Sequence, residues 1–374
     1  MKNKVRVLHV LTDSNIGGAG HHLLALLDKK NGICRNTFHL AVALPHGAKL
    51  TPLFENQDIN CIELPHLAER SYSKAAVGAL HNEMITFQPH IVHTHAALSG
   101  RLAARRYKKC KIVHTRHSVF EPPSWQKRFP ARNFFGLLNN RLSDAIIAVS
   151  PAAKDNLLAL GTQENKIHTI FNGMPPAKEY SPAERLELRR KYNISQDAFT
   201  LVQIARLTEV KGHDYVLDAA KNLPNALILL AGEGERRTHL EARIKNEGIN
   251  NVRLLGFITE VEEIFAIMDV QLSASFGTEA TSLALIHGMS VGKPAIVTNY
   301  GGNPYVISHE ENGLLIPTRS SNALMEAVNK LQGNNSLYNH MSAKSREVYV
   351  ARFTLEEMVR KTEQLYLKRE LLHE

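Results

Sequence analysis

Two basic residues stand where they could bind a phosphate group. Arg206 and Lys211 lie in the segment Ala205–His213, between an apolar stretch typical of a strand and a helical pattern. An arginine guanidinium holds phosphate oxygens as a planar fork, and a lysine ammonium holds them as a point charge. A lone Arg-x4-Lys-Gly segment is more often a solvated basic loop, so the phosphate interpretation depends on a second feature of the chain.

That second feature is the segment Glu279–Pro294. An acidic residue, Glu279, precedes an apolar run with helical character, and His287 follows eight positions later. Thr281 and Ser282 stand at the expected helix start, where free backbone N–H groups and the helix dipole favour an anion. Together the two segments predict a phosphate group between this helix start and the two basic residues. Two alternatives stay open: Glu279 as a helix-cap partner, and His287 as a buried histidine bonded to a backbone carbonyl.

Both segments resemble the motifs of one enzyme family. The spacing of Glu279 and His287 resembles the E-x7-E signature of the retaining glycosyltransferases of family 4, which have the GT-B fold. His287 replaces the second Glu of that signature. The segment Ala205–His213 resembles the family motif G-R-L-x-x-x-K-G, with Ala205 in place of the first Gly. The resemblance implies that the two basic residues bind the diphosphate of a sugar nucleotide, that Glu279 binds the donor sugar, and that His287 faces the ribose.

The resemblance also assigns glycine-rich loops to the donor site. The loop at Gly232 lies near the phosphates, and the loop at Gly256 and Phe257 reads the base through its backbone. The loop at Gly17 and Gly18 approaches the donor phosphate or the acceptor, which the small size of glycine permits. Any of these glycines could equally mark only a tight turn. The residues expected in catalysis are His117, Arg206, Lys211 and Glu279, and those expected to bind the donor are Gly17, Gly18, Gly232, Gly256, Phe257, Thr281, Ser282 and His287.

Several histidines, His22 among them, raise the question of a metal site. His93 and His95 alternate along a predicted strand and would share one face of it. His117 matches the histidine that the family places near the donor sugar. No cysteine or clear carboxylate completes a ligand set in the sequence, and the resemblance implies a reaction without a metal or another cofactor. The loop after the first strand is not G-x-G-x-x-G followed by an acid, which argues against a nicotinamide cofactor.

The candidate residues lie between predicted strands and helices. Along the chain, apolar runs rich in β-branched residues alternate with helical patterns. This alternation is typical of an α/β fold with parallel sheets. In the first half of the chain the expected strands are Val5–Leu11, Phe38–Ala43, Ile59–Glu63, Ile91–Thr94, Lys111–Thr115 and Ala145–Val149. In the second half they are Thr200–Ile204, Ala226–Ala231, Val252–Leu255, Val270–Ser273 and Pro294–Thr298.

The alternation lapses at the Pro-rich segment Met174–Pro182, which predicts two Rossmann-like domains. The resemblance implies that their sheets face each other across a central cleft. It assigns residues 1–174 to the acceptor side, 175–352 to nucleotide-sugar binding, and 353–374 to a helix returning to the first domain. The amphipathic pattern Leu355–Leu372 predicts that last helix.

Composition restricts the partners. The formal net charge of +9 suits nucleotide phosphates, an anionic lipid surface or nucleic acid. No nucleic-acid module is recognisable, and the aromatic content of 6% is low for a base-stacking surface, so no nucleic-acid partner is expected. Three widely spaced cysteines suit a reducing cytosol. No apolar run reaches the roughly 18 residues of a membrane-spanning helix.

One segment favours contact with a membrane surface. Trp125–Arg141 contains the only Trp of the chain, three Phe residues and several basic residues. Basic and aromatic side chains on one amphipathic segment are typical of binding to anionic lipids. A core helix with one solvated face is an equally good interpretation.

These observations combine into one hypothesis. The chain is expected to transfer a sugar from a nucleotide sugar, most simply a UDP-sugar, to a glycan or lipid-linked glycan in surface polysaccharide synthesis. It would work in the cytoplasm, with a peripheral position on the inner face of the cell membrane as an added expectation. Three alternatives remain: a catalytically weak relative that only binds nucleotide sugars, a GT-B sugar-nucleotide epimerase, and, ranked lowest, a basic nucleic-acid binder.

Overall fold

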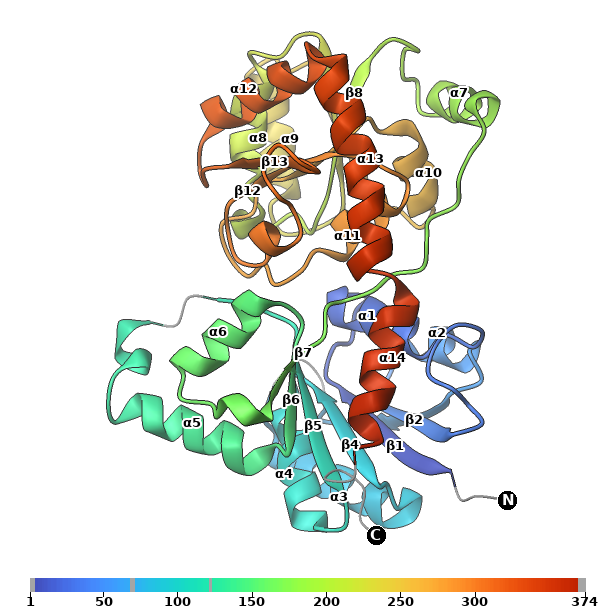
Figure 1. The fold of residues 1–374 in the computed structure, drawn as a ribbon, viewed down its shortest axis with the longest axis vertical. Helices are drawn as coiled ribbons and strands as arrows, with labels where there is room; N and C mark the ends of the chain where they lie inside the picture. Colours follow the sequence, from blue (N-terminus) through green and yellow to red (C-terminus); the bar gives the residue numbers. More distant parts are fainter. Residues whose placement is uncertain (1–3, 68–70, 121–122, 369–374) are drawn as a thin grey trace. The chain divides into compact units, whose positions relative to one another are not determined.

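The computed structural model describes residues 4–67, 71–120 and 123–368 of the chain. The chain forms two compact units. The first unit comprises the residues up to Pro175 together with those from Phe353 onward, and the second unit comprises Pro176–Arg352. Each unit has its own parallel sheet and its own hydrophobic core (Figure 1).

The sheet of the first unit has the order β3-β2-β1-β4-β5-β6-β7 within the described residues, and its pairs are parallel. Six of its strands were predicted. The seventh, β7, has three residues, too few for an apolar run to stand out in the sequence. The strands are β1 (Val5–Leu11), β2 (Phe38–Pro45), β3 (Asn60–Leu64), β4 (Ile91–His95), β5 (Lys111–Arg116), β6 (Ala145–Ala148) and β7 (Ile167–Thr169).

Strand β1 shows why this sheet is covered on both faces. Val7 and Leu11 belong to one hydrophobic cluster, and Leu8 and Val10 belong to the cluster on the opposite face. Alternate residues of a strand point to opposite faces, so a strand covered on both sides reads as a continuous apolar run. The covering helices of this part of the chain are α1 (Gly18–Leu26), α2 (Thr51–Glu55), α3 (Lys74–Phe87), α4 (Leu98–Tyr107), α5 (Ala131–Leu142) and α6 (Pro151–Ala159).

The last helix, α14 (Leu355–Tyr366), belongs to the first unit. Its apolar face, including Met358 and Tyr366, joins the cluster that contains Phe38, and the helix contacts α1 (Figure 1). The predicted end of this helix at Leu372 is wrong, because the chain already turns at Leu367. Residues 369–372 of that prediction lie outside the described residues.

The sheet of the second unit has the order β10-β9-β8-β11-β12-β13 within the described residues and is also parallel. Five strands were predicted, and β13 was missed because it is a short edge strand after a polar turn. The strands are β8 (Phe199–Ile204), β9 (Ala226–Ala231), β10 (Val252–Gly256), β11 (Val270–Ser273), β12 (Ala295–Thr298) and β13 (Gly313–Ile316).

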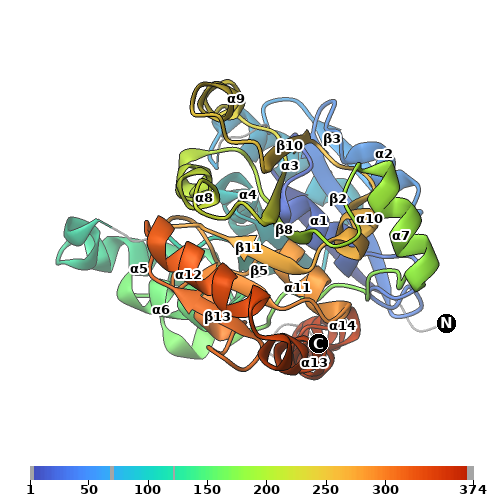
Figure 2. The same ribbon diagram turned by 90° about the horizontal axis from the view of Figure 1, so that it is seen from above.

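Helices cover both faces of this second sheet, and Figure 2 shows them around it. Helices α8, α9 and α12 contribute to one hydrophobic cluster, and α7 and α10 contribute to the cluster on the other face. The helices of this unit are α7 (Pro182–Lys191), α8 (His213–Ala220), α9 (Arg237–Asn246), α10 (Val261–Ile267), α11 (Leu283–Ser290), α12 (Ser321–Gln332) and α13 (Asn335–Arg352).

Each sheet has one point where its strand order reverses. It lies between β1 and β4 in the first unit and between β8 and β11 in the second unit. Ligands of open parallel sheets bind beyond the carboxyl ends of the strands at such points. The loops that follow β1, β4, β8 and β11 therefore hold the candidate functional residues.

Candidate functional site

In the second unit, the loop after β8 brings Lys211 to Glu279. The Nζ atom of Lys211 lies 2.6 Å from an Oε atom of Glu279, although 68 positions separate them in the chain. Glu279 is only 7% exposed and also accepts a hydrogen bond from the Ser275 hydroxyl at 3.2 Å. A buried ion pair needs such additional bonds to offset the loss of hydration. An ammonium has three donor hydrogens, so the bond to Glu279 leaves Lys211 capacity for an anion.

Glycines allow these loops to approach one another closely. A Cβ atom on Gly302 would stand 1.4 Å from the carbonyl oxygen of Ala280, and one on Gly232 would stand 2.1 Å from that of Ala205. Gly232 also has a φ of +144°, which residues with a side chain rarely adopt. The backbone N–H of Gly302 donates to the Glu279 carbonyl at 3.0 Å. Side chains at these positions would therefore force the loops around Glu279 apart.

Helix α11 begins after Ser282, at the position expected for the helix start. Ser282 is its N-cap residue, and its hydroxyl accepts a hydrogen bond from the Leu285 N–H at 3.3 Å. Thr281 directly precedes it and is buried. The first turn of a helix presents backbone N–H groups and a partial positive charge. Lys211, Glu279 and this helix start thus occupy the same carboxyl edge of the sheet.

The other residues predicted for this unit occupy different positions. Arg206 directly follows the loop residue Ala205 and has an exposed side chain. Phe257 comes after the end of β10 and is 58% exposed, and Gly256 before it has a φ of +75°. His287 lies in the last turn of α11, with its ring edge-on to Phe265 of α10 at a centroid distance of 4.9 Å.

In the first unit, His117 belongs to a cluster of buried imidazoles. His95 of β4 is its centre: its Nδ1 atom lies 2.8 Å from Nε2 of His117, and its Nε2 atom lies 3.2 Å from Nδ1 of His9. His93 lies on the same face of β4, as predicted, with ring centroids 4.4 Å apart. His22 of α1 stands edge-on to His117 at 4.7 Å. Gly17 is the N-cap residue of α1, and Gly18 is the first residue of that helix.

Burial keeps these imidazoles neutral. Loss of hydration, followed by the charge of neighbouring groups such as His22 and Arg35, lowers the pKa of His9 to about 3. Burial lowers the pKa of His22 to about 4, against the opposing effect of a hydrogen bond with Asn172. Burial also holds the pKa of His95 and of His117 well below the usual range. A neutral imidazole offers one donor and one acceptor, which suits hydroxyl groups of a sugar.

The same cluster contains two possible metal-ligand sets. In each, one nitrogen from each of three histidines lies within 4.8 Å of the others, and the sets are His9, His93, His95 and His22, His95, His117. The electrostatic surroundings disfavour a dication here. Arg35 lowers the pKa of His9, a member of the first set, so positive charge already acts on that set.

Sequence reasoning named His22 among the histidines that raise the question of a metal site, but it missed one member of the cluster, His9. The signal was present, because His9 stands near the carboxyl end of β1 and the strand order places β1 beside β4. It was usable only once that order was known. The partnership between Tyr366 of α14 and His93, whose Oη and Nδ1 atoms lie 2.5 Å apart, could not be read from the sequence.

The segment Trp125–Arg141 has a packed side as well as exposed aromatic side chains: Gly136 is buried, and the Asn139 amide donates to the Thr162 hydroxyl at 3.0 Å. It forms a short 3-10 turn, Ser124–Lys127, and most of helix α5. Trp125 is 59% exposed, Phe134 63% and Phe129 82%. Across the part of the chain that the structure describes, we find no helix that is both long and apolar enough to cross a membrane.

Comparison with known proteins agrees with this architecture. The family description Glycosyltransferase Family 4 matches residues 16–178, and Glycosyl transferases group 1 matches residues 184–348. The N-acetyl-alpha-D-glucosaminyl L-malate synthase of Bacillus anthracis is 27% identical over 285 residues, which cover 74% of each chain. The UDP-Gal:alpha-D-GlcNAc-diphosphoundecaprenol alpha-1,3-galactosyltransferase of Escherichia coli is 26% identical over 299 residues, covering 74% of this chain and 75% of that one.

A solved structure has the same fold. The crystal structure of Anabaena HepE in complex with UDP and glucose superimposes with a TM-score of 0.85. Its sequence identity is 19%, and the match covers 97% of this chain and 100% of that one.

Proposed function

Because this chain belongs to the glycosyltransferases of the GT-B type, related to bacterial polysaccharide and lipopolysaccharide transferases, we propose that it transfers a sugar from a UDP-sugar to an acceptor hydroxyl with retention of configuration. The observation that carries this proposal is the Lys211–Glu279 pair at the start of α11. It offers a cation for the diphosphate and a carboxylate for sugar hydroxyls at one edge of a parallel sheet. The UDP bound by HepE and the UDP-sugar donor of the E. coli transferase support the choice of nucleotide.

In the proposed mechanism, the chain stabilises the charge that develops on the leaving group. The bond between the anomeric carbon and the diphosphate oxygen breaks while the acceptor oxygen bonds to that carbon on the same face. The acceptor hydroxyl passes its proton to the departing phosphate. Arg206, Lys211 and the backbone N–H groups at the start of α11 stabilise the diphosphate, which needs no metal ion. Glu279 orients the donor sugar by accepting hydrogen bonds from its hydroxyls.

The donor and the reaction class can be tested together. We expect UDP to raise the melting temperature more than GDP or ADP, because binding to the native state stabilises it. We also expect label from a UDP-sugar to appear in a lipid-linked glycan acceptor, and EDTA to leave the rate unchanged. Conversion of the nucleotide sugar without an acceptor would indicate the epimerase alternative. Binding of UDP without turnover of any donor in a panel of nucleotide sugars would indicate a relative that only binds.

The residue at position 287 is relevant to the alternative that this chain binds a nucleotide sugar without transferring the sugar. A carboxylate could accept hydrogen bonds from both ribose hydroxyls, whereas neutral His287 has a single acceptor nitrogen. Its ring packs against Phe265. We propose that His287 holds the ribose less tightly than the usual Glu would, and that the diphosphate contacts provide most of the affinity for the nucleotide.

We further propose that the acceptor is lipid-linked and that the protein works at the cytoplasmic face of a membrane. Exposed Trp125, Phe129 and Phe134 support this, together with the basic residues of the same segment and the net charge of +9. Aromatic side chains enter the boundary between lipid head groups and acyl chains, and basic residues are attracted to anionic lipids.

Binding to lipid vesicles tests this surface. The protein is expected to sediment with vesicles that contain an anionic phospholipid and to be released as salt rises, because screening acts over about 8 Å at physiological ionic strength. Phe129→Ser and Phe134→Ser together should weaken binding by about tenfold or more, since each removes an exposed apolar side chain from the contact. Val350→Ser, at an exposed apolar position on α13, serves as the control. Equal binding to neutral and anionic vesicles, or none at low salt, would contradict the assignment.

A further inference from the structure

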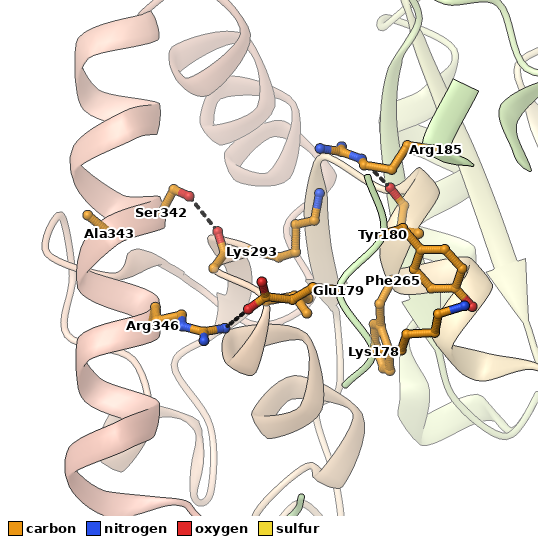
Figure 3. A pocket seen from close by; sticks show the side chains of 12 residues that line it. Lys178, Glu179, Tyr180, Arg185, Phe265, Lys293, Ser342, Ala343 and Arg346 are labelled. Carbon is orange, nitrogen blue, oxygen red and sulfur yellow. Dashed lines mark hydrogen bonds and ion pairs between the residues drawn. The ribbon is translucent and has the colours of Figure 1, made fainter. Parts of the chain in front are cut away.

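A cavity lies in the second unit, at the end of the sheet opposite Lys211 and Glu279. It has a volume of about 540 Å³. Its walls come from residues 178–180, which precede α7, from the helices α7, α10 and α13, and from the turn that ends in Lys293 (Figure 3). Lys293 stands two residues before the first residue of β12, whereas Glu279 follows β11. Because these strands are parallel, the cavity and the Lys211–Glu279 pair are at opposite ends of the sheet.

The cavity is strongly cationic. Four basic residues line it, and Glu179 is its one acidic lining residue. Glu179 is already paired with Arg346, whose Nη1 atom lies 2.7 Å from an Oε atom of Glu179. The basic lining residues are Lys178, Arg185, Lys293 and Arg346.

Lys293 is the most deeply buried of these groups, at 7% exposure. Its ammonium donates one hydrogen bond, to the carbonyl oxygen of Met268. Burial, reinforced by the charge of Arg185, lowers the pKa of Lys293 to about 8, and Asp269 opposes this shift. Asp269 is shared, because it also lies 3.6 Å from Arg189 and accepts a hydrogen bond from the Thr200 N–H. This one carboxylate is therefore shared by Lys293 and Arg189 and cannot neutralise both charges.

Arg185 completes the arrangement. Its Nε atom donates to the carbonyl oxygen of Ala266 at 2.9 Å, which fixes the side chain along the cavity wall. Figure 3 shows the head groups of Arg185 and Lys293 directed toward one another. Two like charges in a partly desolvated space raise the energy of the folded state unless an anion lies between them.

We propose that this cavity binds a soluble phosphate monoester, with its phosphate between Lys293 and Arg185. Arginine and lysine are the side chains that bind phosphate oxygens, one as a fork and one as a point charge. Tyr180, which also lines the cavity, provides an aromatic wall for the organic part of the ligand. The volume of about 540 Å³ exceeds that of an inorganic phosphate ion and falls within the range typical of small-molecule sites. The proposal does not depend on the function of the opposite edge.

Calorimetric titration tests this site in a full-length background that carries Arg206→Ala, Lys211→Met and Glu279→Gln. These changes remove both basic side chains from the opposite edge without leaving Glu279 as an unpaired carboxylate. Glucose 1-phosphate is expected to bind saturably, inorganic phosphate about tenfold more weakly, and glucose not at all. Lys293→Met and Arg185→Gln should each weaken binding of glucose 1-phosphate by about tenfold or more, since each removes a charge-assisted contact. Lys344→Met removes an exposed lysine on α13 that pairs with Glu347, and should leave binding unchanged.

Circular dichroism distinguishes a variant that no longer binds the ligand from a variant that no longer folds. Because two different lining residues are substituted, a folding defect in one variant does not decide the outcome. Absence of saturable binding by glucose 1-phosphate in the correctly folded background would overturn the proposal, as would unchanged binding in both Lys293→Met and Arg185→Gln. Tighter binding of dihexanoyl phosphatidic acid than of glucose 1-phosphate would assign the cavity to a lipid head group instead. Titration of the wild-type chain with UDP tests the proposed donor site at the opposite edge. The two proposals, UDP binding there and glucose 1-phosphate binding in the cavity, can therefore fail independently.

Discussion

Lys211→Ala and Arg206→Ala are each expected to lower the rate of sugar transfer by about 10²-fold or more. Loss of one preorganised group that stabilises developing negative charge has an effect of this size. UDP affinity should fall as well, because both side chains are assigned to the diphosphate. Steady-state rates with a UDP-sugar and calorimetric titration of UDP measure the two effects.

The variant at Lys211 needs a matched control, because it also leaves the buried Glu279 carboxylate without its partner. Removal of one member of this partly buried ion pair should therefore lower the melting temperature. The double variant Lys211→Met with Glu279→Gln removes both charges and should restore the melting temperature without restoring transfer. Lys245→Ala, at an exposed position on α9, should behave like the wild type. If Arg206→Ala and the double variant turn over like the wild type, the diphosphate site is elsewhere.

Acidification is expected to unfold the first unit while the second unit is still folded. Burial lowers the pKa of eight described histidines of the first unit, including His21 and His90. The shift is large for six of them: His9, His22, His93, His95, His114 and His117. Since the folded state binds fewer protons than the unfolded state, their contribution to stability is complete above the unfolded pKa of about 6.5. It is lost as the pH falls from there toward the folded values, about 3 for His9 and about 4 for His22.

The size of this effect follows from the number of groups. Each such histidine contributes up to about 1.4 kcal/mol per pH unit below 6.5, so six contribute at most roughly 8 kcal/mol per unit. A domain has about 5–15 kcal/mol of total stability, so one or two pH units suffice. Arg35, Arg101 and Arg116 add repulsion once the imidazoles are charged. Glu357 of α14, whose pKa its partner Arg360 helps lower to about 2, stays ionised in this range.

Scanning calorimetry between pH 7.5 and pH 5 checks this expectation. Two transitions should separate as the pH falls, with the lower one belonging to the first unit. His9→Gln keeps a neutral polar side chain but does not titrate, so it should reduce the pH dependence of that transition by up to about 1.4 kcal/mol per unit. His39→Gln, at an exposed position on β2, should leave the pH dependence unchanged. A transition that stays constant down to pH 5 would show that the cluster accommodates its protons without unfolding.

Local features of the sequence were sufficient to predict most secondary structure. Strands such as Thr200–Ile204 and Ala226–Ala231 coincide with β8 and β9 within a residue, because buried parallel strands are continuous apolar runs bounded by polar or glycine residues. The start of α11 was predictable from Ser282, since an N-cap depends on residues within one turn. The order of the elements and the two motif segments were also sufficient to indicate the GT-B type.

Only the tertiary structure decided which of these local features meet. The strand order places β1 beside β4, which assembles His9, His93 and His95 into one cluster, and the reversal between β8 and β11 pairs Lys211 with Glu279. It also gathers Arg185 and Lys293, more than 100 positions apart, around a cavity that no motif indicates. Periodicity and capping are set by neighbours within a few residues, whereas burial, pKa shifts and ion pairs depend on contacts between distant segments. The sequence alone therefore determined the elements and the type of chemistry, and the packing of the sheets determined the charge state and partners of the residues that would carry it out.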